Sequence, residues 1–276
     1  MGLRSELLAL AEQACEEFSV APVSRIFMPE PTPSPERDSE FGIVALEDGA
    51  AGLYYAWMGD SQKGMNRRHR VEDYLGHSPA KLLQLYSREH EADRSLGMAA
   101  LNAISQSVFQ QAGMKLPDAG DSMGELDVQE GDHVGMVGYF PSLVRRLLAA
   151  GIKVTVIEKK THLLKQEHNL VMSPDPAALE GCSRVLCTAS TLLNDTIDEI
   201  LAHCGDAGVI NIIGPTAGFI PDPLFQAGVS AIGGSQLVDV NLAIERVSHK
   251  QGLGSAARKY LLKREDYCGY SGLARL

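Results

Sequence analysis

Runs of small and hydroxyl-bearing residues follow short apolar segments in the second half of the chain. Small residues let a ligand approach the backbone, and the free amides at the start of a helix favour anions. The candidate ligand-contacting residues are Gly138, Tyr139, Phe140, Pro141, Glu158, Thr188, Ser190, Thr191, Asn194, Pro215, Thr216 and Gly234. Taken together they predict a crevice for a small molecule. The alternative is that they only form turns and helix caps.

The first of these runs lies in HVGMVGYFPSLVRRLLAAGIKVTVIEKK, residues 133–160, which has the strand, turn, helix and strand pattern of a nucleotide-binding unit. Glu158 follows Gly138 by about 20 residues, a spacing that suits a ribose hydroxyl. The G-x-G-x-x-G motif is absent, because Tyr139 and Phe140 replace residues that let pyrophosphate reach the helix. Pro141 is well tolerated in a first helical turn. We expect a planar or nucleoside-like ligand rather than NAD bound in the usual way; Glu158 could equally be a solvated charge at a strand end.

Neither metal binding nor nucleophilic catalysis has a supporting motif, so metal ligands, catalytic residues and cofactors stay unassigned. There is no G-x-S-x-G, and the cysteines do not have C-x₂-C spacing. Their odd number suits reduced thiols in a cytoplasm. Three polar residues near predicted apolar surface are either site residues that reach an interdomain cleft, or caps and buried hydrogen-bonding partners: Asn102, Glu125 and Asp239.

The composition is that of a soluble globular protein, with 45% hydrophobic and 22% charged residues among 276. A formal charge of −10 argues against nucleic-acid or anionic-membrane partners. No apolar run approaches the ~18 residues of a membrane span. Glutamates interrupt the first helix where a signal peptide would be apolar, so we expect a cytoplasmic protein. The mixed basic and apolar tail, 253–276, suits packing on a surface, its own or that of a second subunit in a homo-oligomer.

The elements that must position the candidate residues follow from hydrophobic periodicity. The first half predicts a helix over 3–18, a strand over 23–27, a hairpin over 40–57 and a helix over 94–111. From residue 133 onward, five short apolar strands alternate with helical segments, which predicts a doubly wound, mostly parallel sheet. In such a sheet the ligand crevice lies beyond the carboxyl ends of the strands, at the switch point in strand order.

The chain resembles the putative heavy-metal chelation family. The matching segments are VGMVGYFPSLVRRL, VLCTASTLLNDTID and VINIIGPTAGFIPDPLFQAGVSAIGGSQLVD, with EFGIVAL and GMAALNAIS in the first half. The resemblance implies an α/β fold with an α+β, enolase N-terminal-like domain over 1–118 and a Rossmann-like domain over 119–276. Two departures are Ala189 and Asp195, where the family pattern favours glycine.

Two functions therefore stand side by side. The chain is expected to bind a small anionic or planar metabolite, of a nucleotide-like kind, in the interdomain cleft. The family name suggests the alternative, which is heavy-metal chelation or metal handling.

Overall fold

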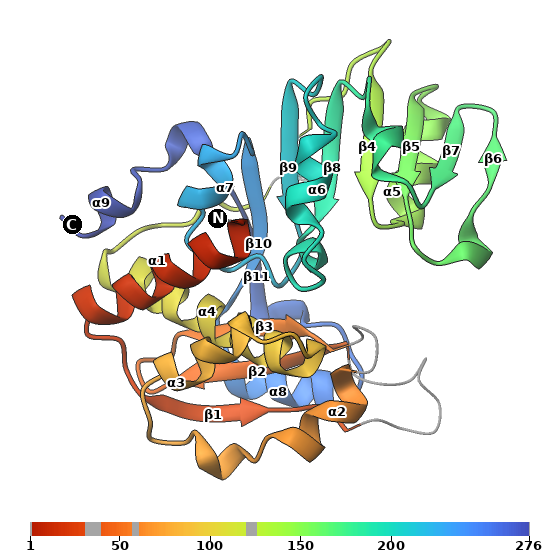
Figure 1. Ribbon diagram of the computed structural model, residues 1–276. Helices are drawn as coiled ribbons and strands as arrows, with labels where there is room; N and C mark the ends of the chain where they lie inside the picture. The colour runs from red at the N-terminus through yellow and green to blue at the C-terminus, as the bar shows by residue number, and fades with distance from the viewer. Residues whose placement is uncertain (1, 31–39, 57–60, 120–125, 276) are drawn as a thin grey trace.

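The computed structural model describes residues 2–30, 40–56, 61–119 and 126–275. These residues form a small antiparallel sheet and a large, mostly parallel sheet (Figure 1), which confirms the predicted mixed α/β fold. The strands are β1 (Val23–Phe27), β2 (Phe41–Leu46), β3 (Ala51–Tyr55), β4 (His133–Val137), β5 (Lys153–Ile157), β6 (Gln166–Glu167), β7 (Leu170–Ser173), β8 (Arg184–Thr188), β9 (Val209–Ile213), β10 (Ala231–Leu237) and β11 (Ala257–Lys263). The helices are α1 (Leu3–Glu17), α2 (Ser61–Arg68), α3 (Ala80–Leu83), α4 (Glu91–Gln111), α5 (Pro141–Ala149), α6 (Ile197–Ala202), α7 (Asp222–Gln226), α8 (Val240–Ser248) and α9 (Tyr270–Leu273).

The small sheet has the order β1-β2-β3 and is buried on both faces. Side chains alternate along β2, so that Val44 packs in one apolar cluster with α4 and Ile43 packs in another with α8. Helix α4 comes very close to β3 because Gly52 has no side chain. A Cβ at that position would lie 2.1 Å from the backbone oxygen of Ala99.

The large sheet has the order β11-β10-β9-β8-β4-β5-β7-β6. Its first strand in the chain, β4, pairs in parallel with both β5 and β8. The chain therefore builds outward from β4 in one direction through β5 and β7, and in the other through β8, β9 and β10. The switch point lies between β4 and β8. Of the strands, β6, β7 and β11 have no counterpart among those predicted from the sequence.

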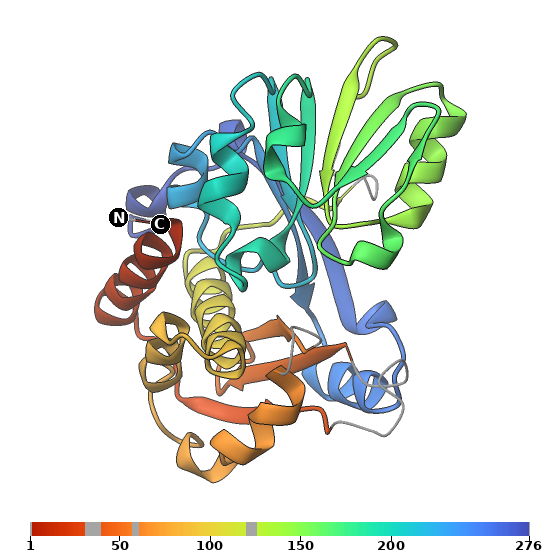
Figure 2. The ribbon, with the colours of Figure 1, turned by 45° about the vertical axis from the view of Figure 1, so that its right-hand side comes forward.

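Helices cover both faces of the large sheet (Figure 2). On one face, Leu143 and Leu147 of α5 pack with Met136 and other strand residues. On the opposite face, α6 contributes Ile197 and Ile200 to a core shared with α1 and α4. No helix in the described part of the chain is long and apolar enough to cross a membrane.

Packing crosses the predicted division between residues 118 and 119 at both ends of the chain. At the start, the Leu3 N–H of α1 donates to Asp198 Oδ1 of α6, at 3.1 Å. Near the end, α8 covers one face of the small sheet (Figure 1). Residues 120–125, which follow this division and include the candidate Glu125, lie outside the described residues. The division into two domains stays a prediction, and the halves share their apolar cores.

The C-terminal segment, which the sequence predicts to pack on a surface, packs on its own chain. Its strand β11 pairs antiparallel with β10 through seven residue pairs from Ala231 to Leu237. The buried Tyr260 hydroxyl of β11 donates to the Ala217 carbonyl at 2.7 Å. The segment is thus part of the large sheet, and the homo-oligomer stays a prediction.

Candidate functional site

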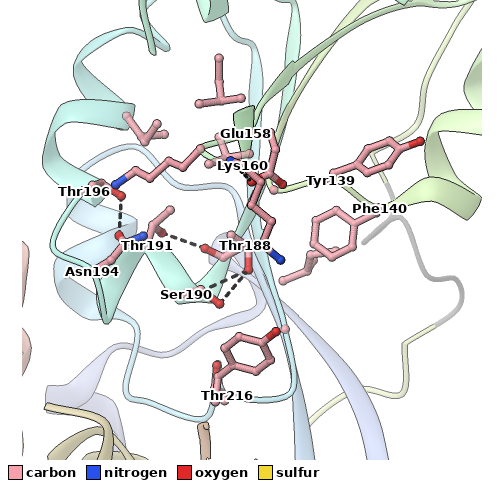
Figure 3. A pocket seen from close by; sticks show the side chains of 18 of the residues that line it. Tyr139, Phe140, Glu158, Lys160, Thr188, Ser190, Thr191, Asn194, Thr196 and Thr216 are labelled. Carbon is pink, nitrogen blue, oxygen red and sulfur yellow. Dashed lines mark hydrogen bonds between the residues drawn. The ribbon is translucent and has the colours of Figure 1, made fainter. Parts of the chain in front are cut away.

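A pocket of about 660 Å³ lies at the carboxyl ends of β4, β5, β8 and β9 (Figure 3). This is the edge that the parallel topology nominates for a ligand. Every predicted candidate residue except Pro141 and Gly234 lines it. The lining residues are Phe41, Tyr55, Val137, Gly138, Tyr139, Phe140, Ile157, Glu158, Lys159, Lys160, Pro174, Pro176, Thr188, Ser190, Thr191, Asn194, Thr196, Glu199, Ile200, Ile213, Gly214, Pro215 and Thr216.

The turn after β4 brings Gly138 against the turn after β8. Gly138 has a φ of 89°, its N–H donates to the Ile157 carbonyl at 2.9 Å, and a Cβ there would lie 3.2 Å from Thr188 Cγ2. Phe140 is the N-cap of α5, and Pro141 is the first residue of that helix, beside the pocket rather than in its wall. The glycine therefore allows the two central strands to end close together at the switch point.

The turn after β8 is a network of hydroxyl groups. Thr188 Oγ1 accepts from the Ser190 N–H at 3.3 Å and so caps the short 3₁₀ helix Ala189–Leu192. Thr191 Oγ1 donates to the Thr188 carbonyl at 2.8 Å. These two threonines hold the turn, as the capping alternative expects, while they also line the pocket. The two interpretations of these residues are thus compatible.

The turn continues into Asn194, whose Oδ1 accepts from the Thr196 hydroxyl at 2.6 Å. Asp195 has a φ of 62°, in the left-handed region that favours glycine. The sequence expectation of a glycine at this position therefore has a conformational basis. The Asp195 carboxylate pairs with Arg4 of α1 at 3.3 Å, which links this turn to the start of the chain.

The loop after β9 is held by the buried polar face of α4. Asn102 Nδ2 donates to the Thr216 carbonyl at 2.8 Å, and Gly218 N–H donates to Asn102 Oδ1 at 3.2 Å. Gln106 Nε2 donates to the Gly218 carbonyl at 2.8 Å. Asn102 is only 1% exposed. Of the two predicted roles for Asn102, a site residue or a buried hydrogen-bonding partner, the second is correct. Through Asn102, the first half of the chain positions Thr216 in the pocket wall.

The first half also contributes two aromatic residues that sequence reasoning missed. Phe41 and Tyr55 are cross-strand partners at one end of the small sheet, with ring centroids 6.0 Å apart. Burial raises the pKa of Tyr55, and the carboxylates of Glu40 and Glu158 raise it further. No local signal could have found these residues, because they reach the pocket only through the packing of the small sheet against the large one.

Charged side chains also lie in the pocket wall. They are Glu158, Lys159 and Lys160 after β5, and Glu199 of α6. Glu158 Oε1 accepts from the Lys160 N–H at 2.9 Å, which fixes the carboxylate. The two lysines were available to sequence reasoning as the residues that follow a strand-end acid. Glu199 and Thr196 had no such signal.

Gly234 is a correction to the sequence prediction. The small residues of Gly233-Gly234-Ser235 predict a turn after the last parallel strand, but this run lies inside β10. The glycine is required because the Ala217 carbonyl and the Tyr260 hydroxyl would lie 2.3 and 2.6 Å from a Cβ at this position. The residue therefore serves packing between β10, β11 and the loop after β9. Asp239 likewise is a helix cap, since its Oδ1 accepts from the Leu242 N–H at 2.9 Å.

Thiols and histidines do not assemble into a metal centre in the described ranges. No group of three or more His, Cys, Asp or Glu side chains in these ranges could hold a metal ion. Burial raises the pKa of Cys182 and Cys204 to about 11 and that of Cys187 to about 12. Metal coordination requires the thiolate, so a metal would have to displace a proton that burial holds more tightly than in an exposed cysteine.

Comparison with known proteins agrees with this architecture. The chain is 26% identical over 254 residues to an uncharacterised protein of Methanocaldococcus jannaschii, covering 83% of this chain and 93% of that protein. A crystal structure from Pyrococcus horikoshii, of a DUF364-family protein with unknown function, has a TM-score of 0.69 at 20% identity and covers 93% of this chain and 99% of its own. A second protein of that family with unknown function, from Desulfitobacterium hafniense, has a TM-score of 0.64 at 19% identity and covers 92% and 98%.

These two likenesses concern the fold. The sequence model of the DUF364 family, described as "Putative heavy-metal chelation", matches residues 121–265. That range holds β4 to β11 and most of the pocket wall. The chain therefore belongs to the DUF364 family, described as putative heavy-metal chelation.

Proposed function

We propose that the pocket binds a small metabolite with a planar ring and an anionic group, of a nucleotide-like kind. The observation that carries this proposal is a pocket at the switch point whose sides differ in chemistry. In Figure 3 the rings of Tyr139 and Phe140 lie on one side, and the hydroxyl-bearing turn Thr188–Thr196 lies on the other. Aromatic faces favour a planar group. In the turn, the Ser190 hydroxyl accepts from Thr188 Oγ1 at 3.3 Å, so its own proton can be donated to an anionic oxygen of a ligand.

The charged side chains of the pocket wall limit the chemical class of the ligand further. Two lysines would attract an anionic group, although the whole chain is acidic. Two glutamates, Glu158 and Glu199, can accept hydrogen bonds and cannot donate them when ionised. A ligand that suits both signs of charge carries an anionic group together with hydroxyl or amino donors.

The pocket draws on both halves of the chain. Phe41 and Tyr55 come from the small sheet, and the remaining wall comes from the large sheet. A ligand would therefore contact both, as in the interdomain cleft predicted from the sequence. The pocket volume of about 660 Å³ is within the roughly 300–1,000 Å³ range of small-molecule sites. We assign no reaction and no catalytic residue.

Isothermal titration calorimetry against nucleotides, S-adenosylmethionine, pterins and NAD tests the proposal. Ser190→Ala removes a pocket hydroxyl that caps no helix, and we expect it to weaken binding about two- to tenfold, the value of one hydrogen bond. Asn194→Ala should act in the same direction. Ser248→Ala, at an exposed position on α8, is the matched control and should leave affinity unchanged.

The proposal fails if no member of the panel binds. It also fails if binding occurs but Ser190→Ala and Asn194→Ala change only stability, since the ligand would then lie elsewhere.

Heavy-metal chelation is the alternative that the family description suggests. It requires stoichiometric metal in protein purified without a tag, and loss of that metal when histidines or cysteines are replaced; none of these residues in the described ranges lines the pocket. Protein that stays monodisperse without metal and binds none when it is added would exclude this alternative.

A further inference from the structure

Glu158 stands where a ribose-binding acid stands in a doubly wound sheet. The parallel strands β7-β5-β4-β8-β9-β10 have the order 3-2-1-4-5-6 when they are numbered along the chain. Glu158 directly follows β5, the second strand, and its N–H donates to the Ser173 carbonyl at 3.0 Å. In sheets of this order, an acid at this place accepts hydrogen bonds from ribose hydroxyls.

The carboxylate of Glu158 is oriented and still has room for a ligand. Its Oε1 is held by the Lys160 N–H at 2.9 Å, and within the described part of the chain Oε2 accepts no hydrogen bond. Glu158 is half-buried and lines the pocket (Figure 3). An ionised carboxylate only accepts, and two neighbouring hydroxyl groups of a ribose supply two donors to it.

The neighbouring phosphate subsite of a dinucleotide lacks several of the usual backbone donors. Pro141, the first residue of α5, has no N–H, and the N–H groups of Leu143 and Val144 both donate to the Phe140 carbonyl at 3.0 Å. The Gly138 N–H is used within the sheet, by the Ile157 carbonyl. A diphosphate at this helix start would need those backbone donors and would also meet the side chains of Tyr139 and Phe140. The aromatic side chains instead offer faces for a ring.

We infer that the pocket takes a single ribonucleoside unit, whose 2′- and 3′-hydroxyls bind Glu158, and that it does not take a dinucleotide. This inference rests on the proposed function and narrows its ligand class. Glu158 then determines specificity for ribose, while α5 contributes packing rather than phosphate contacts.

Calorimetry on the full chain tests the inference with matched probes. The ribonucleoside probes are AMP, GMP, CMP, UMP and S-adenosylmethionine, and NAD is the dinucleotide probe. The deoxy probes are the 2′-deoxy and 3′-deoxy counterparts of the nucleotide that binds best, or 2′-deoxyadenosyl methionine if S-adenosylmethionine binds best. We expect at least one ribonucleoside compound to bind, and its 2′-deoxy counterpart to bind about 10- to 100-fold more weakly, as for a lost hydrogen bond to a charged group. NAD should bind at least tenfold more weakly than the best probe.

Two variants separate hydrogen bonding from electrostatics. Glu158→Gln keeps an acceptor for the Lys160 N–H but loses the carboxylate, so the ribose preference should disappear. Glu199→Gln removes the same charge from another part of the pocket wall and should keep the preference. The deoxy probes give their answer with the unaltered protein, so the inference can fail even if a variant does not fold.

Several results would overturn the inference while the proposed function stands. These are equal affinity for ribose and deoxyribose probes, an unchanged preference in Glu158→Gln, NAD binding as tight as that of the best mononucleoside, or binding of a pterin alone. If no compound of either panel binds, the proposed function fails, and this inference fails with it.

Discussion

Replacement of Asn102 by alanine tests how α4 joins the two sheets. The Asn102 side chain donates to the Leu53 carbonyl of β3 at 2.9 Å and to the Thr216 carbonyl at 2.8 Å, and accepts from the Gly218 N–H at 3.2 Å. Alanine would remove all three hydrogen bonds and leave the three backbone groups without these partners. Asn102 is only 1% exposed, so water does not reach the side chain that holds them.

The expected cost follows from these three groups. A buried polar group that loses its partner costs about 1–3 kcal/mol, and partial relaxation or entry of water reduces the sum. We expect the free energy of unfolding to fall by about 3–5 kcal/mol. In a chain of this size each kcal/mol corresponds to roughly 2–4 °C in Tm, so Tm should fall by about 10 °C.

Urea unfolding and thermal denaturation, each followed by circular dichroism, measure the effect. The matched control is Gln110→Ala, on the same helix, where an exposed amide donates to the Asp48 carbonyl at 3.2 Å. Its cost should stay below about 0.5 kcal/mol. If Asn102→Ala costs no more than Gln110→Ala, the argument that Asn102 holds the loop after β9 against the small sheet is wrong.

Two further predictions concern packing and protonation. Gly234→Ala places a Cβ against the Ala217 carbonyl and the Tyr260 hydroxyl, and should lower the free energy of unfolding by about 1–3 kcal/mol in urea titrations. The control is Gly205→Ala, where a Cβ would have nothing within 4 Å and should have little effect. Equal losses of stability in the two variants would contradict the packing role of Gly234. Burial raises the pKa of Cys187 from 9.0 to about 12, so the stability that this buried thiol contributes is present below pH 9 and is lost as the pH rises toward 12. The free energy of unfolding should therefore fall between pH 8 and pH 11, and less steeply in Cys187→Val; identical slopes would count against the burial argument.

The amino-acid sequence alone predicted five parallel strands of the large sheet, β4, β5, β8, β9 and β10, and the sheet edge at which the pocket lies. Apart from Asn211, strands such as VTVI and VINII consist of β-branched and apolar residues, typical of parallel strands buried on both faces. Once the strands are parallel, their carboxyl ends share an edge, so the residues after β4, β5, β8 and β9 had to lie near one another. Most of the candidate residues could be named for this reason.

Tertiary structure decided what closes the pocket and what holds it. Phe41 and Tyr55 are ordinary strand residues by their sequence, and only the packing of the small sheet brings them to the edge of the large one. Gly234 had the composition of a turn, yet close contact with Tyr260 and Ala217 places it inside a strand. Asn102 could be a site residue or a structural one until its partners were known. The physical reason is common to all of them: a local pattern reports which face of an element is buried, whereas the identity of the partner depends on contacts between residues far apart in the chain.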